Sequence, residues 1–338
     1  MTTVDDDLAA LLDAAGITAN RTLVERMLRA ALQLGQDGTS RLDLKIAASA
    51  VTEMRSAFRL FQPYAGVPKI TVFGSARTRP EDPLYRQARD AAAALAERGW
   101  MVVTGAGPGI MRAAAEGAGD ERALGVSIRL PFEEKAEGVV ADDSRSVEMK
   151  YFFTRKLMLV KESSGFICLP GGFGTLDELF ELLTLQQTGK AEPMPIVLLD
   201  APGGRFWRGL ESFVTEQLEP AGVISPGDFD RVLLTDSAEE AIAEITGFWR
   251  NYHSLRWVGE RLVLRLRHEP SDTELAELDA TFGPLLAEGR IERVAALPPE
   301  VADDDHVDLP RIALHLRRRE VGSLHRLIAA VNGLASAR

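Results

Sequence analysis

The middle of the chain alternates between two hydrophobic patterns. Short apolar runs, typical of buried strands, are each followed by a longer segment with helical spacing of its apolar residues. The predicted strands cover residues 69–73, 100–104, 123–128, 146–149, 166–169, 196–199 and 232–234. The predicted helices cover residues 82–98, 110–117, 151–163, 179–183, 207–218 and 238–252. Repeated β-α units predict an α/β fold, a doubly wound parallel sheet with helices on both faces.

The pattern changes on both sides of this region. Residues 1–62 have apolar residues at helical spacing, such as Leu8, Leu11 and Leu12, and contain no cluster of catalytic residue types. The C-terminal part has strand patterns at 262–266 and 312–316 and helical patterns near 273–288 and 322–332. We therefore expect a helical N-terminal segment (1–62), acting as a cap or an oligomerisation arm. A central domain (63–255) and a small α+β C-terminal appendage (256–338) follow.

Composition restricts the partners and the location. The chain has 39 Lys and Arg against 50 Asp and Glu, a net charge of −11, so it lacks the excess of basic residues that nucleic-acid binding requires. No basic leader and no apolar run of membrane-spanning length is present, and no membrane partner is expected. Cys168 is the only cysteine and lies in an apolar run, which predicts a small core residue. These features predict a cytoplasmic protein.

Glycine-bearing turns follow three of the predicted strands. They are Gly74-Ser75, residues 105–109 and residues 171–175, the last within the sequence Pro-Gly-Gly-Phe-Gly-Thr. The carboxyl ends of parallel strands meet at one edge of a sheet, where ligands of such folds bind. Glycine lets backbone N–H groups approach a ligand closely, and a following helix adds unpaired N–H donors. The turn at 171–175 therefore predicts a phosphate site.

The turn at 105–109 resembles a dinucleotide-binding loop only superficially. Its spacing is G-x-G-x-G, whereas the dinucleotide fingerprint places the third glycine one residue later. No Gly-Lys-Ser/Thr follows, which excludes a Walker A loop. A tight β-α turn without a ligand is the alternative for this run taken alone.

The distribution of histidines limits the chemistry of the central region. All five histidines follow residue 252. A histidine base, a histidine-ligated metal and Ser-His or Cys-His catalysis are therefore disfavoured there. Carboxylates, Arg, Lys and backbone donors remain, and neither a metal nor a cofactor is expected.

Glu178 is the carboxylate of greatest interest, and two interpretations are open. Thr175 and Glu178 have the spacing of a capping box, in which Glu178 would only bond the start of its own helix. Alternatively, Glu178 faces the sugar of a bound ligand, where it could stabilise an oxocarbenium-like centre and orient a water. Asp177 is expected to be a first-turn surface acid.

Arg155 precedes the central predicted strand, on a helix whose apolar stripe is expected at Phe153, Leu157 and Val160. Arg155 falls away from that stripe. It is either a solvated side chain or a permanent charge that pairs with a ligand phosphate or a departing base. Lys156 is a less specific neighbour, expected at the surface or beside the substrate.

These residues together resemble a known family. Residues 170–178 fit the signature P-G-G-x-G-T-x-x-E, and Arg155-Lys156 and residues 105–111 fit upstream motifs of the LOG family. Its members are cytokinin riboside 5′-monophosphate phosphoribohydrolases, often labelled lysine decarboxylases. The resemblance covers roughly residues 67–250 and implies a Rossmann-like fold. It also implies hydrolysis of a nucleoside 5′-monophosphate, such as a cytokinin riboside monophosphate or AMP, to free base and ribose 5-phosphate.

The resemblance also implies roles for individual residues. Arg155 and Glu178 correspond to the catalytic pair of the family. The residues expected to bind phosphate or line the nucleotide pocket are Gly171, Gly172, Gly174, Thr175, Gly74, Ser75, Gly107, Met111 and Lys156. Family members are homo-oligomers, dimers or larger, with sites near subunit contacts. The segments 1–62 and 258–338 depart from the compact family pattern.

Two rival functions remain open. One is a nucleotide or cofactor carrier that binds without turnover. The other is a pyridoxal-phosphate-dependent decarboxylase, for which Lys150, Lys156 or Lys161 would have to form the Schiff base.

Overall fold

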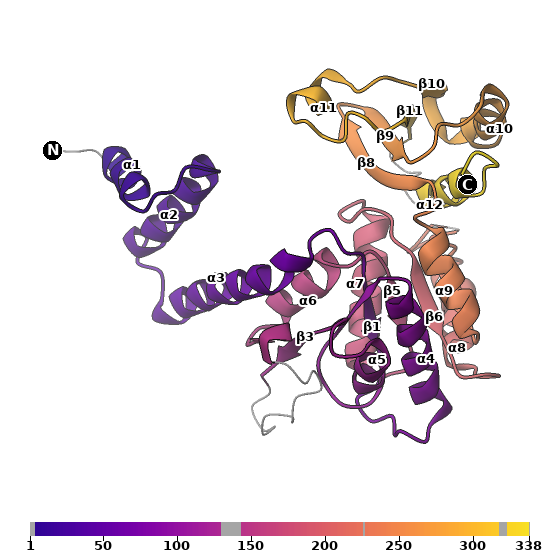
Figure 1. Cartoon of the computed structure of the whole chain (residues 1–338), viewed down its shortest axis with the longest axis horizontal. Helices are drawn as coiled ribbons and strands as arrows, with labels where there is room; N and C mark the ends of the chain where they lie inside the picture. The colour runs from indigo at the N-terminus through magenta and orange to yellow at the C-terminus, as the bar shows by residue number, and fades with distance from the viewer. Residues whose placement is uncertain (1–3, 130–142, 226, 318–322, 338) are drawn as a thin grey trace. The chain divides into compact units, whose positions relative to one another are not determined.

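The computed structural model describes residues 4–129, 143–225, 227–317 and 323–337 (Figure 1). The chain divides into two compact units, residues 1–56 and 57–338. The second unit contains two separate sheets, one of seven and one of four strands. The expected domain limits at 62/63 and 255/256 stay predictions.

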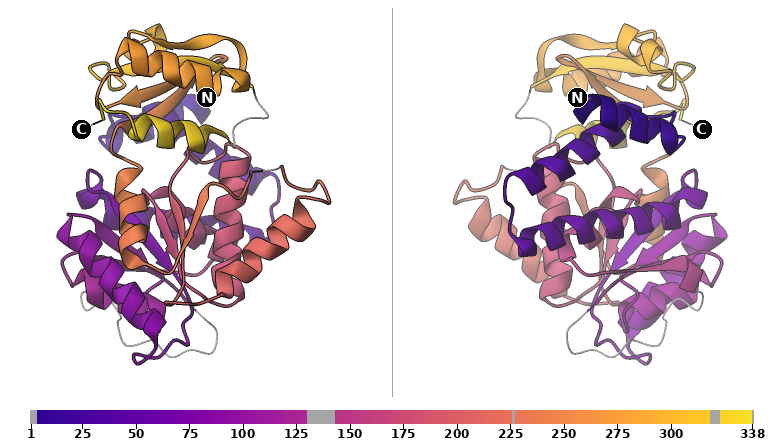
Figure 2. Two further views of the ribbon diagram at one scale, coloured as in Figure 1. Left: turned by 90° about the vertical axis from the view of Figure 1, so that its right-hand side faces the viewer. Right: turned by 90° about the vertical axis from the view of Figure 1, so that its left-hand side faces the viewer.

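The N-terminal unit is helical, as its apolar spacing predicted. It consists of α1 (Val4–Ala14), α2 (Arg21–Gln36) and the first part of α3 (Arg41–Phe61). Leu8 and Leu12 of α1 are buried, whereas Leu23 and Met27 of α2 are exposed. Figure 2 shows the three helices as separate rods joined by short turns.

The central sheet is parallel throughout, and the α/β Rossmann-like prediction is confirmed. Its strand order is β4-β3-β2-β1-β5-β6-β7. The strands are β1 (Lys69–Phe73), β2 (Met101–Thr104), β3 (Ala123–Ile128), β4 (Ser146–Met149), β5 (Phe166–Cys168), β6 (Ile196–Leu199) and β7 (Val232–Thr235). Strands β1 and β5 lie side by side in the middle, so the glycine turns that follow them are neighbours at the carboxyl edge.

Helices connect these strands. They are α4 (Pro83–Glu97), α5 (Ile110–Ala118), α6 (Phe152–Lys161), α7 (Phe173–Gln187), α8 (Phe206–Phe213), which continues as a π-helix (Val214–Leu218), and α9 (Ala238–Gly247). Helices α4, α5 and α9 share one apolar core with the sheet, in which Ile70, Leu95 and Ile245 are fully buried. This packing holds the sheet in place, and the glycine turns extend from the carboxyl ends of its strands.

The C-terminal sheet is antiparallel, with the order β10-β11-β9-β8. Its strands are β8 (Tyr252–Val258), β9 (Arg261–Leu266), β10 (Leu286–Arg293) and β11 (Arg311–Leu316), and its helices are α10 (Asp272–Phe282), α11 (Pro298–Ala302) and α12 (Leu324–Asn332). The helix predicted at 273–288 is too long, because a 3-10 turn at Gly283–Leu285 ends it and strand β10 follows. The helix predicted at 238–252 likewise ends at Gly247, and β8 was missed. Residue 322, the predicted start of the last helix, lies outside the described residues.

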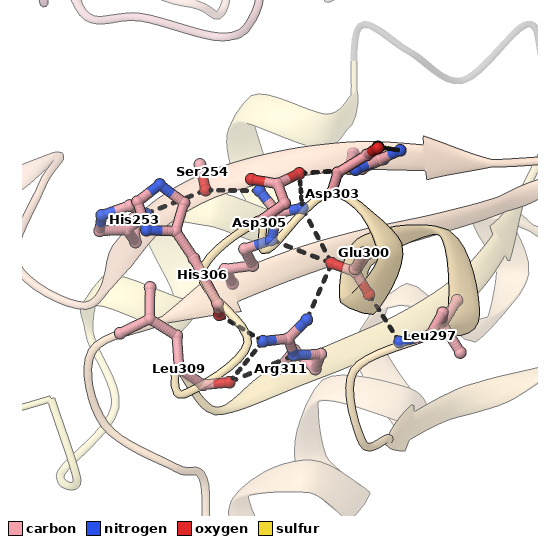
Figure 3. A network of polar contacts seen from close by, with 11 residues as sticks. His253, Ser254, Leu297, Glu300, Asp303, Asp305, His306, Leu309 and Arg311 are labelled. Carbon is pink, nitrogen blue, oxygen red and sulfur yellow. Dashed lines mark hydrogen bonds and ion pairs between the residues drawn. The ribbon is translucent and has the colours of Figure 1, made fainter.

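A buried ion network holds the C-terminal sheet to α11 (Figure 3). Both Arg265 Nη2 and Arg311 Nη1 lie 2.8 Å from Glu300 Oε1. The backbone N–H of Leu297 donates to Glu300 Oε2 at 3.0 Å. Asp305 accepts from Arg265 at 2.6 Å. These partners neutralise one another and leave no excess charge for a ligand, so the network is structural.

Candidate functional site

The turn between β5 and α7 exposes the start of a helix. Helix α7 begins at Phe173, with Gly172 as an extended N-cap residue that makes no side-chain cap hydrogen bond. Thr175 therefore lies inside the helix, and the capping box that its spacing with Glu178 allowed does not form. The first N–H groups of α7 stay available, which suits an anion.

Glu178 is buried one turn into α7. The residue is 6% exposed, and its Oε2 atom has no hydrogen-bond partner among the described residues. Burial raises the pKa of Glu178 to about 7, against the opposing effect of Arg155 and Lys156. A buried carboxyl with an unpartnered oxygen is costly to maintain, and it is common at reactive sites.

Arg155 reaches from α6 to strand β3 and to the residue that follows β2. Its Nε donates to the carbonyl of Val126 at 2.9 Å and its Nη2 to the carbonyl of Gly105 at 3.4 Å. Its Nη1 lies 3.9 Å from Oε1 of Glu178. Burial lowers the pKa of Arg155, although Glu178 opposes the change. The solvated alternative for Arg155 is therefore wrong.

The expected apolar stripe of α6 is also wrong in part. Phe153 is 55% and Leu157 47% exposed, whereas Met158 and Leu159 are fully buried beside Val160. The buried face of α6 is thus displaced from the predicted stripe, and two large apolar side chains are left at the surface.

Gly105 makes room for the Arg155 guanidinium. A Cβ atom at Gly105 would lie 2.0 Å from Arg155 Nη2 and 2.8 Å from Met111 Sδ. A Cβ atom at Gly107 would lie 2.6 Å from Met111 Cε. Gly107 and Met111 were expected near the pocket and do contact each other. Gly105 was missed as a site residue, although the glycine-rich turn was its signal.

The turn after β1 interlocks with the other two turns. The backbone N–H of Ser75 donates to the carbonyl of Pro170 at 3.2 Å, and that of Ile110 donates to the carbonyl of Ser75 at 3.0 Å. A Cβ atom at Gly74 would lie 2.5 Å from the side chain of Ile110. The three predicted turns therefore form one continuous structure at the sheet edge.

The turn at 171–175 combines one crowded glycine with two open ones. A Cβ atom at Gly171 would lie 2.2 Å from Thr175 Oγ1 and 3.0 Å from the backbone nitrogen of Ser75. At Gly172 and Gly174 a Cβ atom would meet nothing within 4 Å. The open positions are the ones a ligand could approach.

Lys156 points to α7 and not into solvent. Its Nζ lies 3.0 Å from Asp177 and 2.5 Å from Glu181, and its side chain is 15% exposed. Burial by itself would lower its pKa, but these two carboxylates outweigh that effect and raise the pKa of Lys156. Asp177 is a surface acid, as expected, and the structure adds its ion pair with Lys156.

Other residue types that could supply catalysis or bind a metal were also considered for this site. Cys168 is fully buried, which confirms it as a core residue, and burial raises the pKa of its thiol. Among the described residues, no group of three or more His, Cys, Asp or Glu side chains could hold a metal ion. Within the same residues, no helix has both the length and the apolar character that crossing a bilayer requires.

Comparisons with known proteins identify the family. The model of a family described as "possible lysine decarboxylase" matches residues 110–245. A cytokinin riboside 5′-monophosphate phosphoribohydrolase of Mycobacterium tuberculosis is 32% identical over 163 residues, which are 47% of this chain and 83% of that protein. The chain belongs to the LOG family. The enzyme of the same name from Mycobacterium marinum is 33% identical over 50% of this chain and 87% of its own length.

A solved structure is similar to about half of this LOG-family chain. The molybdenum cofactor binding protein of Rippkaea orientalis is 23% identical, with a TM-score of 0.38, and covers 53% of this chain and 96% of its own. The phosphoribohydrolase LOG1 of Arabidopsis thaliana is 36% identical to this LOG-family chain over 94 residues, which are 28% of this chain and 42% of that protein.

The description of the matching model as a decarboxylase implies pyridoxal phosphate, and the three lysines considered for the Schiff base in this LOG-family chain do not fit that cofactor. Lys156 is held between two carboxylates of α7. Lys161 is exposed and pairs with Glu162, and Lys150 lies over the ring of Tyr151. None of the three is a buried, unpaired amine of the kind that forms a Schiff base readily.

Proposed function

We propose that this chain hydrolyses the N-glycosidic bond of nucleoside 5′-monophosphates and releases the free base and ribose 5-phosphate. The observation that carries the proposal is the buried Glu178 carboxyl. One oxygen of this carboxyl has no hydrogen-bond partner among the described residues, and Glu178 lies one turn into the helix that follows the glycine turn. The M. tuberculosis and M. marinum relatives are named for this activity toward cytokinin riboside 5′-monophosphates. Such a substrate or AMP is the proposed class.

The 5′-phosphate binds at the turn 171–175. The free N–H groups at the start of α7 and its dipole favour an anion, and Gly172 and Gly174 leave the backbone accessible. Thr175 adds a hydroxyl on the same turn. Binding energy from this remote group positions the sugar without taking part in the bond changes.

Glu178 and Arg155 act on the reacting bond. The bond between C1′ and the base nitrogen breaks, its electron pair leaves with the base, and the ionised Glu178 stabilises the cationic ribosyl centre. A water oxygen then bonds to C1′ while Glu178 accepts the proton of that water. Arg155 donates a hydrogen bond to the departing base, and the proton that Glu178 took from the water passes to a nitrogen of that base, so that Glu178 returns to its ionised form. Water is the only co-reactant, so the reaction requires no cofactor.

Incubation with AMP and with isopentenyladenosine monophosphate tests this function. We expect free base and ribose 5-phosphate in equal amounts from at least one of them. Glu178→Gln should abolish release and retain binding of the nucleotide. A wild-type protein that binds nucleotides and releases no base from a panel of them is a carrier, and the enzymatic proposal then fails.

We also infer that the chain forms homo-oligomers through α6 and α7. Phe153 and Leu157 of α6 and Phe173 and Phe180 of α7 are exposed, and Phe173 is 93% exposed. The ion pairs of Lys156 join the two helices, and we propose that these side chains form one apolar surface beside the site. Large exposed apolar surfaces mark interaction sites. A second copy of the chain is the proposed partner, and the cytoplasm is the proposed location.

A further inference from the structure

Lys156 is placed to act on Glu178 and not on the substrate. Its two carboxylate partners, Asp177 and Glu181, flank Glu178 on α7, one residue before it and three residues after it. Arg155, the residue before Lys156 on α6, faces Glu178 itself. Two successive residues of α6 thus engage three carboxylates of a single stretch of α7.

The charges at Lys156 leave no positive excess for a phosphate. One ammonium group faces two carboxylates at 3.0 and 2.5 Å, so the local sum is negative. A phosphate brought to Lys156 would be repelled by Asp177 and Glu181 and would have to displace one of them. The backbone donors at the start of α7 provide an alternative site without that cost.

We propose that Lys156 is a positioning residue, which holds the Asp177–Glu181 stretch of α7 against α6 and keeps Glu178 ionised for catalysis. This inference rests on the proposed hydrolase function and names the role of a residue within the same site.

The charged and titratable groups around Glu178 give the direction of the effect. Arg155 and Lys156 of α6 favour the ionised carboxylate, whereas Glu181 and Asp177 of its own helix disfavour it. The thiol of Cys168 at the end of β5 also interacts with Glu178. Removing the Lys156 charge takes away one group that favours the ionised carboxylate and leaves the charges of Asp177 and Glu181 uncompensated. The neutral form of Glu178 is then favoured, and its pKa rises.

The pH dependence of kcat/KM for base release tests the role. In the wild type we expect activity to rise with pH, with a midpoint near the Glu178 pKa of about 7. Lys156→Met should move this midpoint upward by about one pH unit, a loss of about tenfold below pH 6. The KM and the inhibition constant of ribose 5-phosphate should change less than about threefold above the midpoint.

Matched variants separate charge from structure. Lys161→Met, on the same helix but paired with Glu162 and lying over the ring of Phe58, should leave the midpoint unchanged. Lys156→Arg should keep the wild-type midpoint. Lys156→Met combined with Glu181→Gln should return the midpoint toward the wild type, because one uncompensated carboxylate is removed.

An unchanged midpoint in Lys156→Met, with inhibition by ribose 5-phosphate weakened tenfold or more, would show that Lys156 binds the phosphate and would overturn the inference. Titration of the Glu178 carboxyl by ¹³C NMR, assigned with Glu178→Gln, provides the readout that does not depend on turnover. If no nucleotide is cleaved, the function fails. The Lys156 effect on the carboxyl is then still measured, and no shift on Lys156→Met would refute it separately.

Discussion

Arg155 Nη1 and Glu178 Oε1 face each other at 3.9 Å, which is too far for a hydrogen bond. Each group is held from elsewhere, Arg155 by the carbonyls of Val126 and Gly105 and Glu178 by its position in α7. A pair held apart in this way keeps both groups available to a bound molecule.

Glu178→Gln should stabilise the protein at alkaline pH. Burial raises the pKa of Glu178 to about 7 from an ordinary value of 4.5, so the native state holds this proton more tightly than the unfolded state. The wild type therefore loses stability relative to the variant as pH rises from about 4.5 through about 7. We expect a difference of about 3 kcal/mol in the free energy of unfolding at pH 8. Urea denaturation of both proteins at pH 4 and pH 8 measures this difference. The same difference between variant and wild type at both pH values would contradict the burial of this carboxyl.

Gly105→Ala should displace the Arg155 guanidinium. The added Cβ would lie 2.0 Å from Arg155 Nη2, so the side chain has to move. We expect a loss of about 10²-fold in kcat/KM, as for displacements of about 1 Å at other sites. Gly209→Ala is the control, because a Cβ atom there meets nothing within 4 Å and alanine favours the α8 helix. Full activity in the Gly105 variant would show that Arg155 placement is not critical.

Glu300→Gln should unfold the C-terminal sheet more easily. The change removes the charge that compensates the buried Arg265 and Arg311. Breaking such a buried network costs about 3–5 kcal/mol. Asp303→Asn is the matched control, since Asp303 is 61% exposed and its pair with Arg256 should contribute less than about 1 kcal/mol. Chemical denaturation of both variants gives the comparison, and equal small losses would mean that the network is not needed for stability.

Phe153→Glu should reduce the assembly size. A charge in the apolar surface of α6 and α7 would have to be buried without a partner on association. We expect light scattering to give a smaller mass for this variant than for the wild type at equal concentration. Phe213→Glu, an exposed aromatic of α8 outside that surface, should leave the mass unchanged. A wild type that is monomeric at all concentrations would refute the oligomer proposal.

Local sequence patterns were sufficient to predict the parallel sheet and its glycine turns. Each strand-turn-helix unit encodes its own signals, and parallel order then brings the strand ends together. The family motif suggested Arg155 and Glu178 as a catalytic pair, but it could not show that the Thr175–Glu178 cap would not form. The start of α7 at Phe173 depends on how the turn packs against Ser75.

Contacts between residues far apart in the chain could not be predicted from local sequence patterns. The pairing of Lys156 with Asp177 and Glu181, and the space that Gly105 leaves for Arg155, depend on how α6 approaches α7 and β2. The stripe of α6 was misjudged because apolar residues at an exposed surface look like core residues in a linear pattern. Strand β10 was missed because its buried and exposed positions do not alternate regularly.

The full burial of Cys168 at the end of β5 gives this chain a natural reporter of its own opening. A thiol with no access to water reacts with alkylating reagents only when the centre of the sheet separates from its neighbours. Since the chain has no other cysteine, the labelling rate of the unaltered protein measures how often that separation occurs. The same rate, followed with and without nucleotide, would report how strongly occupancy of the adjoining turn suppresses it.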